Sequence, residues 1–254
     1  MTTPSPAGRR SFEEGAWQTP RVTTTSMRLL AQGRDADVFA LDDTRVLRRY
    51  RDPTHSNTQT EARVMEYLAA QGYPVPRVHD VTDIDLVMER LHGPTLMQAW
   101  ERRPWRLVHY ARQLADLHDR LAAVPAPDWL LAPRTLRDRE PGGTGSVLHL
   151  DLHPLNVILT PDRGPVVFDW TNAAAGDPAF DLARTIVTIA TADLPLSPAV
   201  AARSWFLRAL RHASASDPSP RIADAARAKL ADPNHTDTEA ARMRAIIARA
   251  ERHG

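Results

Sequence analysis

The chain has 254 residues, 43% of them hydrophobic and 25% charged, so it can bury one large core or the cores of two small lobes. Its formal net charge of +1 provides no global attraction to nucleic acid or to an anionic membrane surface. The absence of cysteine excludes disulfides, thiolate nucleophiles and cysteine-ligated zinc.

Residues 1–26 are rich in Thr, Pro, Arg and Glu and lack the apolar segment of a signal peptide. We expect a mobile leader over this stretch and a cytoplasmic location for the protein. The longest apolar run, from Thr185 to Ala192, is too short to span a bilayer, so neither a membrane nor nucleic acid is an expected partner.

Five short runs between residues 27 and 90 have the composition of strands and are bounded by turn residues. They lie near residues 27–30, 38–41, 45–50, 77–81 and 86–89. Between the third and the fourth run, residues 58–71 carry hydrophobic side chains at helical spacing. This order predicts an N-terminal lobe over residues 27–90, made of an antiparallel sheet of about five strands with one helix.

The pattern becomes mainly helical after a hinge expected at Met88 to Gly93. A hydrophobic stripe runs from Leu107 to Leu121, and later helices are expected to begin near Ser197 and near Thr236. A strand hairpin interrupts the helices between residues 147 and 170. Residues 91–254 are therefore predicted to form a helical C-terminal lobe with one hairpin, which makes the fold class α+β.

Three polar side chains in this hairpin region carry the chemistry. Asp151 follows a short strand, Asn156 closes the loop after it, and Asp169 ends the hairpin. Phosphoryl transfer from a nucleotide needs a carboxylate that orients and deprotonates a hydroxyl, and oxygen ligands that hold magnesium against the phosphates. The spacing of the three residues predicts such a site.

Three segments of the chain resemble the aminoglycoside phosphotransferase and choline kinase family, whose members phosphorylate small molecules on a protein-kinase-like fold. The similarity extends over roughly residues 27–190 and is strongest between Val147 and Ala183. The segments are His149-x-Asp151-x-x-Pro154-x-Asn156, Phe168-Asp169-Trp170 and Gly176-Asp177-Pro178-x-x-Asp181-Leu182-Ala183.

The resemblance implies a two-lobe enzyme that uses ATP or GTP and Mg²⁺ to phosphorylate a hydroxyl of a metabolite or an antibiotic. It implies Asp151 as the catalytic base and Asn156 with Asp169 as magnesium ligands. It also implies that His149 and Asp181 are structural supports of the catalytic loop. The acceptor is expected to bind in the C-terminal lobe.

The resemblance further implies a nucleotide site in the N-terminal lobe and at the hinge. The family's lysine on the third strand is absent, and the strand pattern places Arg48 at that position, with Glu61 of the helix as its partner. Arg49 is then expected on the opposite face of the sheet. The residues implied in nucleotide binding are Gly33, Arg48, Glu61, Met88, Glu89 and Leu91.

Two other functions remain open from the sequence. A nucleotide-binding regulatory protein without catalysis is one, because the lysine is missing and the loop at Gly33 has a single glycine. A zinc hydrolase is the more remote one, because His149, Asp151 and His153 alternate along the chain and these residue types bind zinc.

Charge also bears on the acceptor. From Leu182 to Gly254 the chain has eleven Arg and Lys residues against seven Asp and Glu residues. A polycationic aminoglycoside needs an acidic pocket. The segment between the hinge and the catalytic loop, which usually helps to build the acceptor site in this family, is short. We therefore predict that the protein is not a dedicated aminoglycoside kinase.

Overall fold

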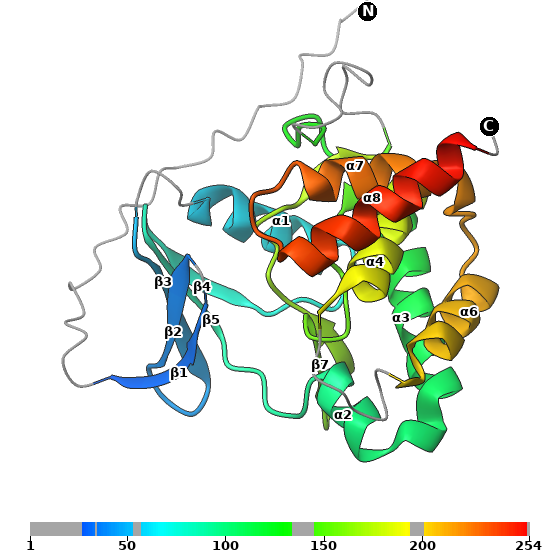
Figure 1. The fold of residues 1–254 in the computed structure, drawn as a ribbon. Coiled ribbons are helices and arrows are strands. Elements are labelled where there is room, and N and C mark those ends of the chain that lie inside the picture. The colour runs from blue at the N-terminus through cyan, green and yellow to red at the C-terminus, as the bar shows by residue number, and fades with distance from the viewer. Residues whose placement is uncertain (1–26, 34, 53–56, 134–144, 194–200, 253–254) are drawn as a thin grey trace, which may run out of the picture.

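A five-stranded antiparallel sheet forms one side of the molecule in the computed structural model, which describes residues 27–33, 35–52, 57–133, 145–193 and 201–252 (Figure 1). The strand order is β1-β2-β3-β5-β4, and the sheet confirms the five strands predicted for the N-terminal lobe. The strands are β1 (Arg28–Gln32), β2 (Ala36–Ala40), β3 (Arg45–Tyr50), β4 (Val78–Val81) and β5 (Asp85–Glu89). The expected leader, residues 1–26, lies outside the described residues.

Helix α1 (Thr58–Ala70) is the one helix among the described residues of this lobe, where one helix was predicted. Ala62, Met65 and Leu68 are buried along one side, because residues three and four apart share a helix face. Gly72 adopts a φ of 75° directly after the helix, a left-handed conformation that favours glycine and ends helices.

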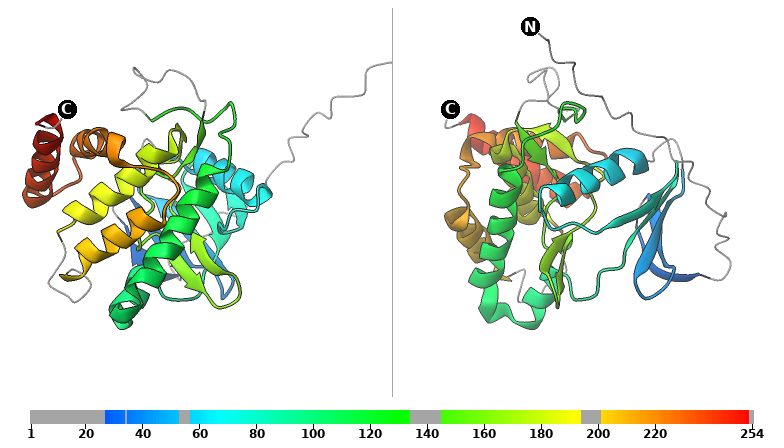
Figure 2. Two further views of the ribbon diagram at one scale, coloured as in Figure 1. Left: turned by 90° about the vertical axis from the view of Figure 1, so that its right-hand side faces the viewer. Right: turned by 180° about the vertical axis from the view of Figure 1, so that it is seen from behind.

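The second lobe is mainly helical and stands opposite the sheet (Figures 1 and 2). Polar caps fix several helix starts: Thr95 with Gln98 and Thr236 with Glu239 form capping boxes, and the Asp177 side chain accepts from the Ala179 N–H. The helices are α2 (Leu96–Arg102), α3 (Leu107–Ala122), α4 (Pro178–Thr191), α6 (Arg203–Ala213), α7 (Ile222–Leu230) and α8 (Asp237–Glu251), with 3₁₀ turns η3 (Pro104–Arg106) and η4 (Ser219–Arg221).

Two small antiparallel sheets belong to the second lobe, where β6 contacts α3 and α4, and β7 contacts α2. Strand β6 (Ser146–Leu148) pairs with β9 (Ala174–Gly176), and β7 (Val157–Thr160) pairs with β8 (Gly164–Val167). The β7–β8 pair is the predicted hairpin, but β9 and α7 were not expected as separate elements. The helix start expected near Ser197 lies outside the described residues, and α6 begins at Arg203.

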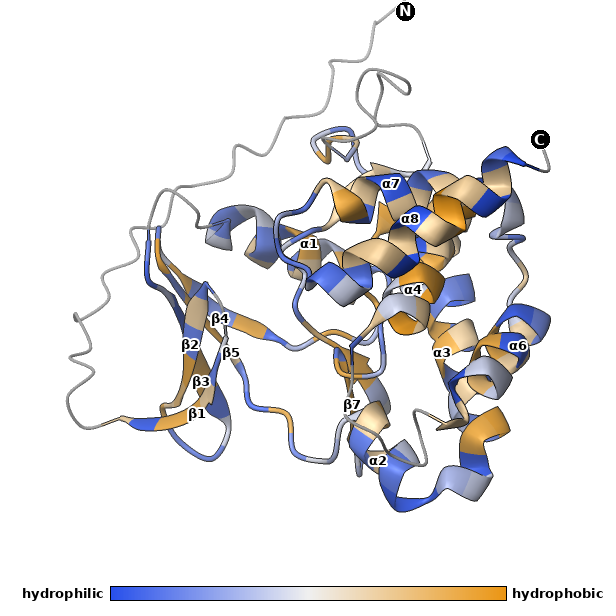
Figure 3. Cartoon of the chain, in the orientation of Figure 1, coloured by the Kyte–Doolittle hydropathy of each residue, from blue (hydrophilic) through white to orange (hydrophobic). Residues whose placement is uncertain are grey.

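A continuous hydrophobic core joins the two lobes. It runs from Leu68 and Leu86 of the first lobe, through Trp170, to Leu117 and Phe206 of the second. Figure 3 shows hydrophobic residues along α4, which packs against α3, α7 and α8. None of the described helices combines the length and the apolar composition that a membrane span requires.

Candidate functional site

The loop after β6 carries Asp151 and is anchored at His149, which is fully buried. The Asp151 backbone N–H donates to His149 Nδ1 at 3.2 Å, and His149 Nε2 lies 3.1 Å from the Phe168 carbonyl oxygen. Because Nδ1 accepts a hydrogen bond, the ring proton is on Nε2, which donates a hydrogen bond to the Phe168 carbonyl oxygen. His149 thus ties the Asp151 loop to the strand end that carries Asp169.

Leu150 holds a left-handed backbone conformation with a φ of 65°, which is costly for a branched residue. Its N–H donates to Asp181 Oδ1 at 2.6 Å, and its carbonyl accepts from Arg184 Nε at 3.3 Å. Asp181 also faces His118 Nδ1 at 3.4 Å. These contacts from α3 and α4 hold the turn that directs Asp151 out of the core.

Asn156 lies at the other end of the loop. Its Nδ2 donates to the Asp151 carbonyl oxygen at 2.9 Å, and its own backbone carbonyl accepts from the Phe168 N–H at 3.1 Å. The hairpin register, in which Val157 faces Val167, therefore brings Asn156 next to the turn at Asp169. Asp169 also has a positive φ, of 67°, so backbone strain marks both carboxylate-bearing turns.

The oxygen atoms of these two residues suit a hard divalent cation. The Asn156 amide points its nitrogen at the Asp151 loop, and neither Asn156 Oδ1 nor Asp169 Oδ2 has a hydrogen-bond partner among the described residues. One amide oxygen and one carboxylate oxygen match the ligands that Mg²⁺ takes when nucleotide phosphates and water complete its shell. The donor set therefore fits magnesium.

Arg48 connects Asp169 to the first lobe. Its Nη1 donates to Glu61 Oε1 at 2.9 Å and to Asp169 Oδ1 at 2.8 Å, and its Nη2 donates to Thr171 Oγ1 at 3.1 Å. The ion pair expected between Arg48 and Glu61 is present. Arg49 points away from this site, as strand alternation requires, and pairs with Asp85 on β5 at 2.6 Å.

Tyr50 and Thr171 complete this network and were not identified from the sequence. The Tyr50 hydroxyl lies 3.2 Å from Glu61 Oε2 and 3.1 Å from Thr171 Oγ1, and Thr171 donates to Asp169 Oδ1 at 2.9 Å. Alternation along β3 was a usable signal for Tyr50, because it lies two positions after Arg48 on the same face. Thr171 gave no such signal, since its role depends on the turn at Asp169.

The carboxyl groups of the site are ionised well below neutral pH. Burial would raise the pKa of Asp169, but the charge and hydrogen bond of Arg48, with the Thr171 hydroxyl, hold it below its usual value. Burial likewise opposes ionisation of Asp151, and the contact with His153, with a smaller contribution from Lys229, keeps the pKa of Asp151 low. Both side chains are therefore carboxylates at neutral pH.

The pKa values of three buried residues near these carboxylates are shifted as well. Burial raises the pKa of Glu61 by more than Arg48 and Tyr50 lower it. Burial and the Glu61 charge raise the pKa of Tyr50 to about 12, so its hydroxyl stays protonated and can donate. Burial lowers the pKa of His149, which keeps that ring neutral.

The remaining nucleotide-site candidates lie at the β1–β2 turn and the hinge. The Gly33 N–H donates to the Ala36 carbonyl, and a Cβ at Gly33 would lie 2.9 Å from that oxygen, so a tight turn requires glycine. Met88 is buried and Leu91 is half-buried. The Glu89 side chain accepts from Arg163 at 2.8 Å and from the Arg77 N–H at 3.1 Å, and its own N–H donates to the Arg77 carbonyl at 2.8 Å.

The zinc-site hypothesis for His149, Asp151 and His153 is wrong. Both ring nitrogens of His149 are used in hydrogen bonds to the backbone, so neither can bind a metal. His153 Nδ1 accepts from the Leu155 N–H, and its Nε2 faces Asp151 Oδ2 at 3.5 Å. Across the described part of the chain, no group of three or more His, Asp or Glu side chains is placed to hold a metal ion.

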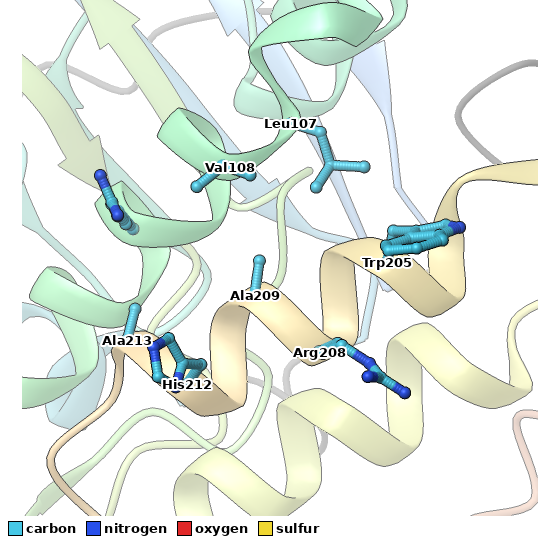
Figure 4. Close-up of a pocket in the computed structure, with 8 residues that line it drawn as sticks. Leu107, Val108, Trp205, Arg208, Ala209, His212 and Ala213 are labelled. Atoms are coloured by element: carbon cyan, nitrogen blue, oxygen red, sulfur yellow. The ribbon is translucent and has the colours of Figure 1, made fainter.

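A cavity of about 660 Å³ lies away from these residues, between α3 and α6. Figure 4 shows Ala209 of α6 pointing toward Leu107 and Val108 of α3, with Trp205, Arg208 and His212 along the same helix. None of its lining residues belongs to the Asp151 loop or to the Arg48 network. We therefore place the candidate site at the junction of the two lobes.

Comparison with known proteins agrees with this fold. The sequence profile described as the phosphotransferase enzyme family matches residues 26–144 and 128–215. No curated protein gives a significant match to the chain.

The chain is also similar to solved structures of aminoglycoside phosphotransferases. ADP-bound APH(2'')-Ib superposes with a TM-score of 0.60 at 13% identity, covering 87% of this chain and 91% of that one. A ternary complex of APH(4)-Ia with ADP and hygromycin B gives 0.56 at 17% identity, over 88% and 94%. The GDP and kanamycin complex of APH(2")-IIIa gives 0.55 at 13% identity, over 93% and 96%.

Proposed function

Because the chain belongs to the phosphotransferase enzyme family, we propose that it transfers the γ-phosphoryl group of ATP or GTP to a hydroxyl of a small molecule, with the help of Mg²⁺. The observation that supports this most is the convergence of Asp151, Asn156 and Asp169 at the lobe junction, with Arg48 bridging Asp169 and Glu61. Similar structures contain ADP in one case and GDP in another, which supports a nucleotide as phosphoryl donor.

The two lobes have different roles, nucleotide binding in the first and acceptor binding with catalysis in the second. Residues 27–90 bind the nucleotide, with Gly33 in the β1–β2 turn and Met88, Glu89 and Leu91 at the hinge. Arg48, oriented by Glu61, binds the phosphates with its planar guanidinium in place of the usual lysine. Residues 91–254 carry the catalytic loop and the acceptor site.

Asp151 orients the acceptor hydroxyl and takes its proton as the new bond between the acceptor oxygen and the γ-phosphorus forms. The bond from that phosphorus to the bridging oxygen breaks, and ADP or GDP leaves. A low pKa suits this role, because the transition state is loose and positioning contributes more than basicity.

Asn156 and Asp169 hold magnesium through their side-chain oxygens, and the metal when bound neutralises the phosphate charge. Asp169 is held in its position by Arg48 and Thr171. His149 and Asp181 keep the loop in shape from the buried side.

The test compares the parent protein with Asp151→Asn. We expect Mg·ATP or Mg·GTP to raise the melting temperature of both proteins, since a ligand of the native state stabilises it. Nucleotide hydrolysis, with water as acceptor, should fall by about 10²–10⁴-fold in Asp151→Asn. The control is Asp162→Asn in the exposed β7–β8 turn, which should hydrolyse nucleotide like the parent.

The outcomes separate the hypotheses. A protein that no Mg-nucleotide stabilises is not a nucleotide-dependent phosphotransferase. Nucleotide binding with equal hydrolysis by the parent and by Asp151→Asn would remove Asp151 as base and favour the regulatory alternative.

A further inference from the structure

A second group of side chains lies behind the Asp151 loop and differs in charge from the carboxylates described above. Arg184 of α4 donates from Nε to the Leu150 carbonyl at 3.3 Å. Its two Nη atoms form no hydrogen bond or ion pair with any described residue. The guanidinium of Arg184 therefore lies next to Leu150, the residue before Asp151, and both of its Nη atoms lack a protein partner.

The surroundings of Arg184 indicate what its two Nη donors can bind. The side chain is half-buried, and burial lowers the pKa of Arg184 against the opposing charges of Asp151, Asp232 and Asp181. The Nη atoms are not among the buried side-chain atoms that lack a partner, so solvent reaches them and a ligand can bind them. A planar carboxylate or phosphate accepts both Nη donors at once.

Lys229 provides a second cation on the same side. It is the single lysine of the chain and lies in the last turn of α7. It has no ion pair or hydrogen bond with the described residues, yet its charge acts on Asp151 and contributes to the low pKa of that carboxyl.

Several acidic residues of the neighbouring helices have partners other than these two cations. Asp224 is bound by Arg221 and Arg227, and Glu239 caps α8. Asp232 accepts hydrogen bonds from the backbone and side chain of Asn234. Arg184 and Lys229 are therefore cations near Asp151 that have no ion pair with a described residue, and their donors are open to an anionic group of an acceptor.

We propose that the acceptor is a hydroxy compound with a carboxylate or phosphate group, which Arg184 and Lys229 bind while its hydroxyl faces Asp151. This inference rests on the proposed function, because it assigns the substrate class of the same site. The anionic group fixes the acceptor at one end, and the orientation of the hydroxyl follows from that attachment.

The single lysine makes a direct test possible. Reductive ¹³C-methylation labels Lys229 with its charge retained, and only the amino terminus gives another signal. The labelled protein, saturated with Mg·ADP, is titrated with two matched pairs: gluconate against glucitol, and glycerate against glycerol. We expect both acids to shift the Lys229 signal and to bind about tenfold or more tightly than the matched neutral compounds.

The variant Lys229→Gln should lower the affinity for the two acids by about tenfold and leave the affinity for the neutral polyols within twofold, as the loss of one charge contact predicts. The control is Arg227→Gln on the same helix, whose charge is already paired with Glu251 and Asp224. It should keep the preference for the acids. Arg184→Lys should also weaken acid binding, provided that its melting temperature matches the parent.

Three results would overturn the inference. One is a Lys229 signal that neither acid nor inorganic phosphate moves. Another is kanamycin binding more tightly than the acids. The third is an equal loss of acid affinity in Lys229→Gln and Arg227→Gln. A protein that Mg·ADP fails to stabilise has failed the proposed function at the first step, whereas one that binds Mg·ADP and fails the acid titration has failed only this inference.

Discussion

The Arg48 guanidinium lies 2.8 Å from the Asp169 carboxylate, although 121 positions separate the two residues in the chain. The contact joins a strand of the first lobe to the end of the hairpin in the second. Arg48 is simultaneously held by Glu61, so one cation links the helix, the sheet and the proposed magnesium ligand. The position of Asp169 is therefore coupled to the packing of α1.

Arg48→Met should remove nucleotide binding and destabilise the fold. The Glu61 side chain is fully buried and would lose its cation, so we expect the free energy of unfolding to fall by about 3–5 kcal/mol. Urea titration and the thermal shift with Mg·ATP measure the two effects. Arg49→Gln is the matched control, because Arg49 pairs with Asp85 on the other face and its loss should cost about 1 kcal/mol or less.

Thr171→Val tests the part of the network that no sequence pattern indicated. The substitution keeps the shape and removes the hydroxyl that bonds Asp169, Arg48 and Tyr50. We expect a loss of about 1–3 kcal/mol and a higher Mg²⁺ concentration for half-maximal nucleotide hydrolysis. Thr171→Ser, which keeps the hydroxyl, should need the same Mg²⁺ concentration as the parent. An unchanged Mg²⁺ requirement in Thr171→Val would show that the hydroxyl does not position Asp169.

Stability should depend on pH through His149. Burial lowers the pKa of His149 in the folded state, whereas in the unfolded chain it titrates near its ordinary value of about 6.5. Below that pH the His149 ring is protonated in the unfolded state and still neutral in the folded state. The free energy of unfolding therefore falls as the pH falls from about 6.5 toward the pKa of the folded state.

The measurement is the melting temperature of the parent and of His149→Gln between pH 5 and pH 8. The parent should lose stability more steeply below pH 6.5, and the difference between the two curves isolates this histidine from the others. Parallel curves would mean that His149 is protonated equally in the folded and unfolded states.

Gly93 at the hinge should tolerate no side chain. It has a φ of 142°, and a Cβ there would lie 2.1 Å from the Leu159 carbonyl oxygen. Gly93→Ala must therefore push the hinge away from the β7–β8 hairpin, and we expect a loss well above the strain of about 1–2 kcal/mol that a left-handed alanine alone costs. Gly72→Ala, with a φ of 75° and open space around it, should show that strain alone. Equal losses in urea titration would contradict the close approach at Gly93.

Local patterns predicted much of the architecture. Alternation and turn residues gave the five strands, and hydrophobic spacing gave α1 and α3, because these signals depend on residues within one turn or one strand of each other. Capping at Thr236 likewise located α8. The strand β9 was missed because three small residues, Ala174 to Gly176, carry no pattern and become a strand only by pairing with β6.

The order of the elements and the residue types of the catalytic loop can be derived from the sequence alone, since both depend on short segments of the chain. The tertiary structure decided which side chains meet: Arg48 with Asp169, Thr171 with Tyr50, and Arg184 with the Leu150 carbonyl. These contacts join residues from different lobes or elements, and burial of the shared core sets their distances. No local preference encodes such a distance, because the energy that fixes it comes from packing the whole chain.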